Sequence, residues 1–217
     1  MKKVFSVLTR LVFTLFIFFC ALYALKFIFG TQTKHVTEEE YKDGEYSHVY
    51  TGMLLNGKMS GSGEIVFSDG SRYKGGFEEG RFNGEGIFYS QEGWRYEGVF
   101  ARGEMTGKGV LYGTAGDILK QSPIPDFISG AGWQYTGSFG EWGQTGEGKI
   151  IFADGAVYEG SFLRGLADGK GMYQSPLGWS YEGGFMRGVF DGEGTLKDNG
   201  RTLAGVWEKG VLVSIDD

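Results

Sequence analysis

The sequence predicts an all-β fold: an elongated, single-layer antiparallel meander of β-hairpins, preceded by one N-terminal transmembrane helix. Three observations support this prediction. The chain has 40 glycines but only 3 prolines, and 16% of its residues are aromatic. A Tyr-x-Gly-x-Phe phrase recurs, mostly at intervals of 23 residues, and self-similarity at a fixed period is typical of repeat architectures. Finally, a long apolar stretch lies at the start of the chain.

The apolar stretch is expected to make residues 1–30 a membrane anchor. Leu11 to Gly30 contains Lys26 as its only charge, and twenty such residues in a helix span about 30 Å, the thickness of a bilayer's hydrocarbon layer. A cleaved signal peptide is the alternative, because its shorter apolar region would also fit here. The small residues that cleavage requires are poorly placed, since Ala21 and Ala24 are separated by Leu and Tyr.

The flanking charges predict how the chain crosses the membrane. Lys2, Lys3 and Arg10 precede the apolar stretch, which favours a cytoplasmic N-terminus and a translocated remainder. We therefore expect a single-pass protein of the cell membrane with its repeats outside the cytoplasm, and the anchor-plus-domain layout suggests a bacterium. The only cysteine, Cys20, lies within the apolar stretch. A disulfide framework or a cysteine metal site is thereby excluded.

Residues 31–49 read as an acidic linker, and the charge balance beyond residue 30 limits the choice of partner. The first 30 residues hold four basic and no acidic residues, so the rest carries 17 basic against 27 acidic residues. A part this acidic is repelled by phosphate backbones and by anionic lipid surfaces. Nucleic acid is therefore not an expected partner, and binding of anionic lipid by the repeats is not expected either.

Residues 50–212 hold six complete repeat units and a partial seventh, in which Leu203 takes the place of tyrosine. Each unit has Gly two positions after its tyrosine, a large apolar residue two positions further on, and then a Gly-x-Gly pair. The complete units begin at Tyr50, Tyr73, Tyr96, Tyr135, Tyr158 and Tyr181. Their first glycines are Gly52, Gly75, Gly98, Gly137, Gly160 and Gly183, and their phenylalanines are Phe77, Phe100, Phe139, Phe162 and Phe185.

The spacing within a unit predicts one β-hairpin per unit. Tyr-x-Gly-x-Phe has period two, so its three residues face the same side of one strand, and the Gly-x-Gly element reads as the partner strand. A glycine inside a strand commonly marks the close approach of another group. We expect it to leave a slot that a ring from a neighbouring strand fills. A further glycine between the two strands suits a tight turn with positive φ.

The phrases YKGGFEEGRFNGEG, YEGVFARGEMTGKG and YEGSFLRGLADGKG resemble the MORN repeat (membrane occupation and recognition nexus). The resemblance covers about residues 50–210. It implies an elongated, twisted, single-layer antiparallel sheet and a scaffolding role. One departure is Trp142, which stands where the fourth unit should have its turn glycine, with Gly143 one position later. A shifted or bulged turn is expected there.

The array looks like a three-unit module copied once. Tyr96 and Tyr181 differ by 85 positions, as do Trp94 and Trp179. The two modules are joined by residues 113–134, which add 16 residues to the regular period and contain two prolines. Long loops in compact arrays are often functional, although a tolerated insertion would look the same. Residues 213–217 read as a tail.

No enzyme signature is present, and no catalytic residue, cofactor or metal is expected. His35 and His48 both precede the first unit and have no metal-ligand partner at a useful spacing. Asp69 and Asp154 lie in Asp-Gly turns, where aspartate serves the turn itself. The Gly-x-Gly pairs are not phosphate loops, because no Gly-Lys-Ser/Thr sequence and no helix follows them.

The expected function is that of a membrane-anchored, non-catalytic scaffold or adaptor that binds a protein partner, or itself, through the repeat surface. The alternative is a cell-envelope glycan- or lipid-binding module that uses exposed aromatic residues. An exposed Trp could anchor a partner chain or stack on a sugar, although a structural role is open for each. The candidate partner-binding residues are Phe127, Trp133, Trp142, Trp94 and Trp179.

Overall fold

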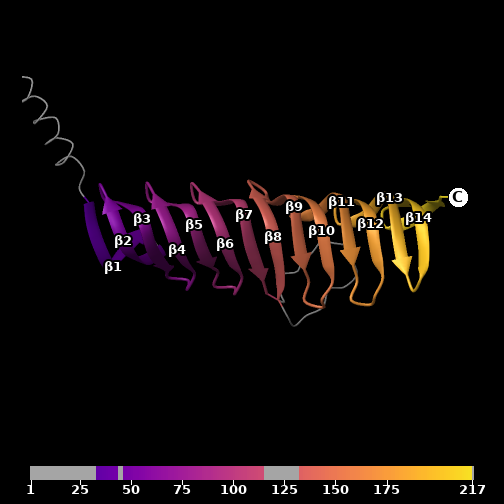
Figure 1. Ribbon diagram of the computed structural model, residues 1–217. Coiled ribbons are helices and arrows are strands. Elements are labelled where there is room, and N and C mark those ends of the chain that lie inside the picture. Colours follow the sequence, from indigo (N-terminus) through magenta and orange to yellow (C-terminus); the bar gives the residue numbers. More distant parts are fainter. Residues whose placement is uncertain (1–32, 44–45, 115–131, 217) are drawn as a thin grey trace, which may run out of the picture.

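A computed structural model describes residues 33–43, 46–114 and 132–216 of the chain. They form one sheet of 15 antiparallel strands whose spatial order is the order along the chain. Figure 1 shows the strands side by side along a rod, from β1 at one end to β14 near the other. The strands are β1 (Thr33–Asp43), β2 (Tyr46–Leu55), β3 (Lys58–Phe67), β4 (Arg72–Glu78), β5 (Arg81–Tyr89), β6 (Arg95–Ala101), β7 (Glu104–Gly113), β8 (Trp133–Gly140), β9 (Gly143–Ile151), β10 (Val157–Leu163), β11 (Leu166–Gln174), β12 (Ser180–Met186), β13 (Val189–Asp198), β14 (Arg201–Glu208) and β15 (Val211–Ile215).

Each repeat unit is one hairpin, as its spacing predicts. In the second unit β4 pairs with β5 from Arg72 opposite Tyr89 to Glu78 opposite Arg81, and Gly75 lies opposite Gly86. The register then shifts between Gly75 and Phe77. Irregularities of this kind bend a strand and increase its twist. The other repeat hairpins have a shift at the corresponding place, so the bend recurs along the rod.

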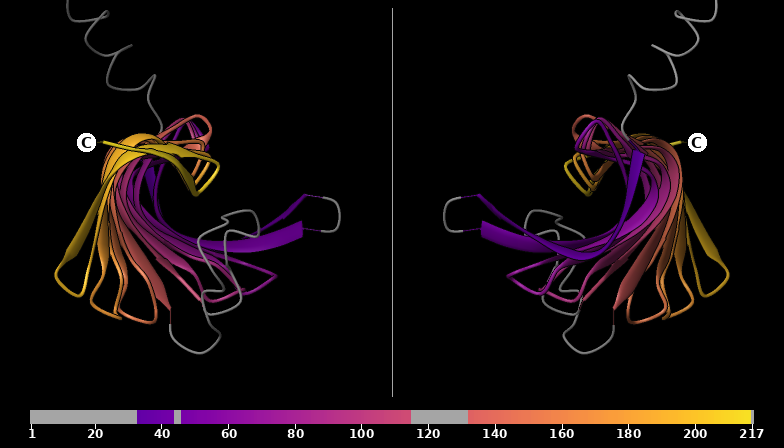
Figure 2. Two further views of the ribbon diagram at one scale, coloured as in Figure 1. Left: turned by 90° about the vertical axis from the view of Figure 1, so that its right-hand side faces the viewer. Right: turned by 90° about the vertical axis from the view of Figure 1, so that its left-hand side faces the viewer.

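The bend turns the sheet into a trough. Tyr73 and Phe77 are four residues apart, which is about 13 Å along a flat strand, yet their ring centroids are only 5.2 Å apart. The strand is therefore folded toward the face that carries both rings. Figure 2, seen along the rod, shows the resulting C-shaped cross-section. We call the face with the Tyr and Phe rings the concave trough and the opposite face the convex face.

The core of the protein is a ladder of rings along the concave trough. The six tyrosines that open the complete units are at most 1% exposed. The Phe77 ring meets the Tyr73 ring of its own hairpin and the Tyr50 ring of the preceding hairpin edge to face, each at 5.2 Å. Edge-to-face contact is a favoured geometry for aromatic pairs. Because each Phe bridges two tyrosines in this way, the ladder locks every hairpin to its neighbour.

The insertion between the modules does not interrupt the ladder. Strands β7 and β8 pair without a shift from Gly107 opposite Phe139 to Gly113 opposite Trp133. The ring centroids of Tyr96 and Phe139 lie 4.9 Å apart across this junction. The inserted chain thus leaves and rejoins the sheet at one edge, and the array continues at its normal spacing.

The sheet extends beyond the predicted array at both ends. Residues 33–43, within the stretch expected to be an acidic linker, form β1, which pairs with β2. Residues 213–215, expected to belong to a tail, lie in β15. The expected anchor over residues 1–30 lies outside the described residues. Among those that are described, no helix is long and apolar enough to cross a membrane.

Candidate functional site

The repeated Tyr and Gly residues are explained by packing. The Tyr73 ring lies over both Gly75 and Gly86: a Cβ on Gly75 would come 2.5 Å from the Tyr73 hydroxyl oxygen and 2.6 Å from Gly86 Cα. The slot predicted at this glycine exists, but the ring that fills it is the tyrosine of the same strand and not, as expected, a ring from a neighbouring strand. The same ring also covers Gly86 on the partner strand. The other five complete units have the same arrangement.

Each buried tyrosine also uses its hydroxyl group. Tyr73 donates a hydrogen bond to the Gly76 carbonyl at 2.9 Å, and Tyr158 donates to Ser161 at 2.9 Å. The other four tyrosines make the equivalent bond to the residue three positions on. Burial raises the pKa of Tyr73 and of Tyr135 to about 12. The tyrosine column therefore has a structural role: it fills the slot and holds the bend closed.

The hairpin turns require an unusual backbone at two successive positions. In the third unit both Arg102 and Gly103 have positive φ, at 55° and 93°, the geometry of a type I′ turn. The fourth unit departs from this pattern, as predicted: of Glu141, Trp142 and Gly143 only the last has positive φ, at 94°. Trp142 is held 67% exposed on this turn, with the Arg164 guanidinium 5.8 Å from its ring centroid.

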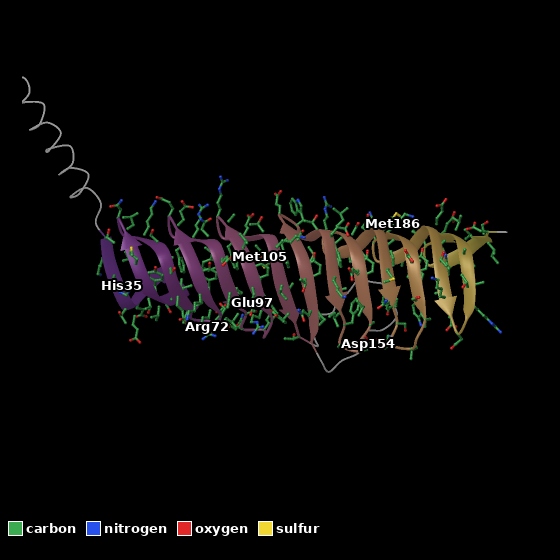
Figure 3. All side chains as sticks on the ribbon, in the orientation of Figure 1. His35, Arg72, Glu97, Met105, Asp154 and Met186 are labelled. Atoms are coloured by element: carbon green, nitrogen blue, oxygen red, sulfur yellow. The ribbon has the colours of Figure 1, made fainter. Side chains whose placement is uncertain are left out.

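The Asp-Gly turns at the opposite edge of the sheet have the structural role expected of them. Asp69 accepts hydrogen bonds from the Ser71 backbone N–H at 2.8 Å and from the Ser71 hydroxyl at 2.6 Å. These bonds lower the pKa of Asp69. Asp154 accepts the Ala156 N–H at 2.9 Å in the same way. Figure 3 shows Asp154 at this edge, and Met105 and Met186 nearer the hairpin-turn edge.

Three of the candidate tryptophans occupy one structural position. Trp94, Trp133 and Trp179 lie two residues before a tyrosine, on the concave trough, and are partly buried against the core. The Trp94 ring lies 5.2 Å from that of Phe88, and the Trp179 ring 5.1 Å from that of Tyr173. The duplicated modules thus repeat the same aromatic pair.

Where a unit lacks this tryptophan, the neighbouring strand supplies a ring. At the five turns between complete units, the two cross-strand positions next to the turn hold one ring and one small residue each time; before the partial seventh unit they hold Asp198 and Arg201. Trp133 illustrates the fit, because its indole covers the position that a Cβ on Gly113 would occupy. These tryptophans are therefore built into the sheet while still lining the trough. The pairs are Phe67/Ser71, Ser90/Trp94, Gly113/Trp133, Phe152/Ala156 and Ser175/Trp179.

The trough contains a cavity of about 340 Å³ where β5 to β9 meet. It lies between the ring-bearing strands and the turns of the third and fourth units. Trp94 is the one candidate residue in its wall, and the turn that carries Trp142 closes one side. Phe127 lies outside the described residues. The cavity is lined by Phe82, Phe88, Trp94, Phe100, Gly103, Glu104, Met105, Gly140, Glu141 and Gly143.

The convex face carries paired charges. Glu97 lies 3.1 Å from the Arg95 guanidinium, and Glu159 lies 3.2 Å from Lys149. The Arg95 guanidinium also stacks 4.2 Å above the centroid of Tyr112. Figure 3 labels Glu97 and Arg72 on the first module. Carboxylates that follow the tyrosines thus lie opposite the rings: Glu97 pairs with Arg95 on its own strand, and Glu159 pairs with Lys149 on the neighbouring strand.

The described residues offer no cluster of three or more His, Cys, Asp or Glu side chains that could hold a metal ion. His35 is exposed on β1, and the His48 ring lies 6.1 Å from that of Phe67. Within the described part of the chain, the repeats bring together a continuous aromatic trough that contains a cavity near its middle.

A family model for the MORN repeat matches residues 50–72, 73–95, 96–118, 158–178 and 181–200, together about half of the chain. The chain belongs to the MORN-repeat family. MORN repeats are generally a non-enzymatic module that contacts proteins or lipids. The unit that begins at Tyr135 is not among the matched segments, and it is the unit with the altered turn at Trp142. No curated protein matches the chain.

Sequence reasoning missed most of the cavity wall. Phe82 and Met105 are the strand partners of Phe77 and Phe100, five positions further along the chain. This position is apolar in every MORN unit except the fourth, which has Gln144. The recurrence of an apolar residue at this position could have predicted that Phe82 and Met105 line the trough. Glu104 and Glu141 carry no pattern that the sequence alone would reveal.

Proposed function

We propose that this MORN protein is a membrane-anchored, non-catalytic scaffold that binds a protein partner, or a second copy of itself, in its concave trough. The observation behind this proposal is the cavity at Trp94. In this cavity, near the middle of the rod, a ligand can reach the row of rings that lines the trough. Aromatic residues with one face against a core are favoured anchors in protein interfaces. Repeat arrays bind along such extended concave surfaces.

The membrane part of the proposal comes from the sequence. The apolar stretch Leu11–Gly30 would anchor the chain, and the basic residues before it would keep the N-terminus in the cytoplasm. The trough would then face the space outside the cell membrane, and we place the protein in a bacterial envelope. The excess of acidic residues argues for anchoring by this stretch alone, without contact between the repeats and anionic lipid.

A glycan of the cell envelope is the second candidate. Rings recur along the trough once per hairpin, so they are spaced by two strands, about 10 Å. An extended polysaccharide could stack on such a row. Trp133 belongs to this row, and its indole covers the position that a Cβ on Gly113 would occupy.

The middle of the rod, with the insertion, Trp133 and Trp142, is the proposed docking region. The test is cross-linking of the intact chain in its native membrane, followed by identification of the captured chains. Trp142→Ser should lose capture of the partner without loss of stability, because the side chain is 67% exposed. Leu177→Ser is the matched control, since Leu177 is 83% exposed on a turn of the second module. Equal capture by both variants and by the unaltered chain would move the site away from the middle.

A further inference from the structure

We propose that the cavity at β5–β9 binds the side chain of an arginine or lysine from a basic segment of the partner. The proposal rests on the proposed function and adds the chemistry that the partner must present. The cavity, its aromatic wall and its unpaired carboxylates are three separate observations that agree on a cation.

The aromatic wall suits a cation. Phe82, Phe88 and Trp94 are partly buried and line the cavity together with the buried Phe100. A guanidinium or ammonium group is attracted to the face of an aromatic ring, most strongly to Trp. The long apolar stem of Arg or Lys also packs well on such a wall, and about 340 Å³ is ample for one such side chain.

Two carboxylates complete the site. Glu104 and Glu141 line the cavity, and both residues are exposed to solvent. Neither side chain has a hydrogen bond or an ion pair with any described residue. On the convex face, Glu64, Glu97 and Glu159 each lie within 3.8 Å of an Arg or Lys nitrogen. Glu182 and Glu193 on that face have no ion pair with a described residue, but they line no aromatic cavity. The cavity therefore offers negative charge that the protein itself does not neutralise.

The second module lacks these features, although it is a copy of the first. Trp94 has its equivalent in Trp179, but Phe82 is replaced by Ala167 and Glu104 by Val189. Glu141 belongs to the altered turn of the fourth unit, which begins the second module. The cation site is thus confined to the junction of the two modules, and the net charge of −6 favours approach of a basic segment from solution.

The experiment compares two peptides on the full-length chain in detergent, at near-physiological salt. One alternates Arg and Ser, and the other alternates citrulline and Ser, which keeps the shape and removes the charge. We expect the arginine peptide to bind roughly tenfold more tightly. The double variant Glu104→Gln/Glu141→Gln should abolish that difference. Glu182→Gln/Glu193→Gln changes the same charge on the exposed convex side and should retain it.

The cation site would be overturned if the two peptides bound equally well or if neither peptide bound. The same is true if the control variant loses as much affinity as the cavity variant, or if a neutral chito-oligosaccharide competes fully with the arginine peptide. Failure of the proposed function is a separate result, because it is read from the native membrane. If the cavity variant still captures the partner there, the scaffold stands and only the cation site falls.

Discussion

At the scale of the residue, one arrangement explains why tyrosine and glycine recur at fixed positions of the repeat. A tyrosine ring lies across two glycines on paired strands, and its hydroxyl group closes the bend through a hydrogen bond to a backbone carbonyl. Tyr73 shows all of these contacts at once, with Gly75, Gly86 and Gly76. Each residue type is therefore fixed by a different requirement: close approach for glycine, ring and hydroxyl together for tyrosine.

Gly75→Ala should destabilise the protein by about 3 kcal/mol or more, because the new Cβ would overlap the Tyr73 hydroxyl and the Gly86 backbone. Tyr73→Phe should cost only about 1 kcal/mol, the net value of one hydrogen bond. Denaturant unfolding measures both. Gly140→Ala is the control, since its Cβ would meet only the Thr145 methyl group, at 3.2 Å. A Gly75→Ala protein as stable as this control would contradict the account of the slot.

Arg102→Asn should stabilise the protein by about 0.5–1 kcal/mol. Arg102 has a φ of 55°, a conformation that costs an ordinary side chain energy and that Asn tolerates well. The measurement is the thermal midpoint, with Arg81→Asn as the control because Arg81 is also exposed but does not have positive φ. No gain at Arg102 relative to Arg81 would show that the turn is not strained.

At the scale of the element, the hairpins were predictable and their exact extent was not. Tyr-x-Gly-x-Phe and Gly-x-Gly each have period two, so strands, pairing and turns follow from local spacing. Strand β1 lacks the phrase altogether and was expected to be a linker, because it becomes a strand only through pairing with the edge of β2. The cavity could not be predicted either, since its wall comes from five strands whose stacking depends on the bend.

Deleting residues 115–130 should leave the fold intact. The deletion retains three residues between Gly113 and Trp133, the same number as between Ser90 and Trp94, where the chain makes a regular turn. Since β7 and β8 already pair in full register, a shorter loop should stabilise the sheet by about 1 kcal/mol through a smaller closure entropy. Thermal unfolding tests this, and a fall of the midpoint would mean that the insertion itself supports the array.

At the scale of the whole molecule, the ring ladder makes one continuous core out of hairpins that contact only their neighbours. The tyrosines of this core make its stability sensitive to alkali. Burial raises the pKa of Tyr73, Tyr135, Tyr173 and Tyr181 to about 12, against about 10 in an unfolded chain. The folded state thus holds protons that the unfolded state releases first.

Below about pH 10 these tyrosines are protonated in both states, so they should give the free energy of unfolding no pH dependence. The free energy of unfolding should then fall steeply as the pH rises toward about 12. Because several tyrosines act together, the slope should exceed that of a single proton. Denaturant unfolding at a series of pH values measures this. Tyr73→Phe should reduce the slope, because it removes one of the groups whose pKa is raised by burial.

The concave trough as the partner surface is the central claim, and a photo-cross-linking residue placed on either face tests it most directly. Trp94 and Trp179 mark the trough, whereas Tyr89 and Gln174 end the adjacent strands β5 and β11 of the preceding hairpins and lie on the convex face. In the native membrane, cross-links to the partner should form from the Trp94 position and be absent from Tyr89 and Gln174. Cross-links from the two convex positions, with none from the trough, would contradict the account.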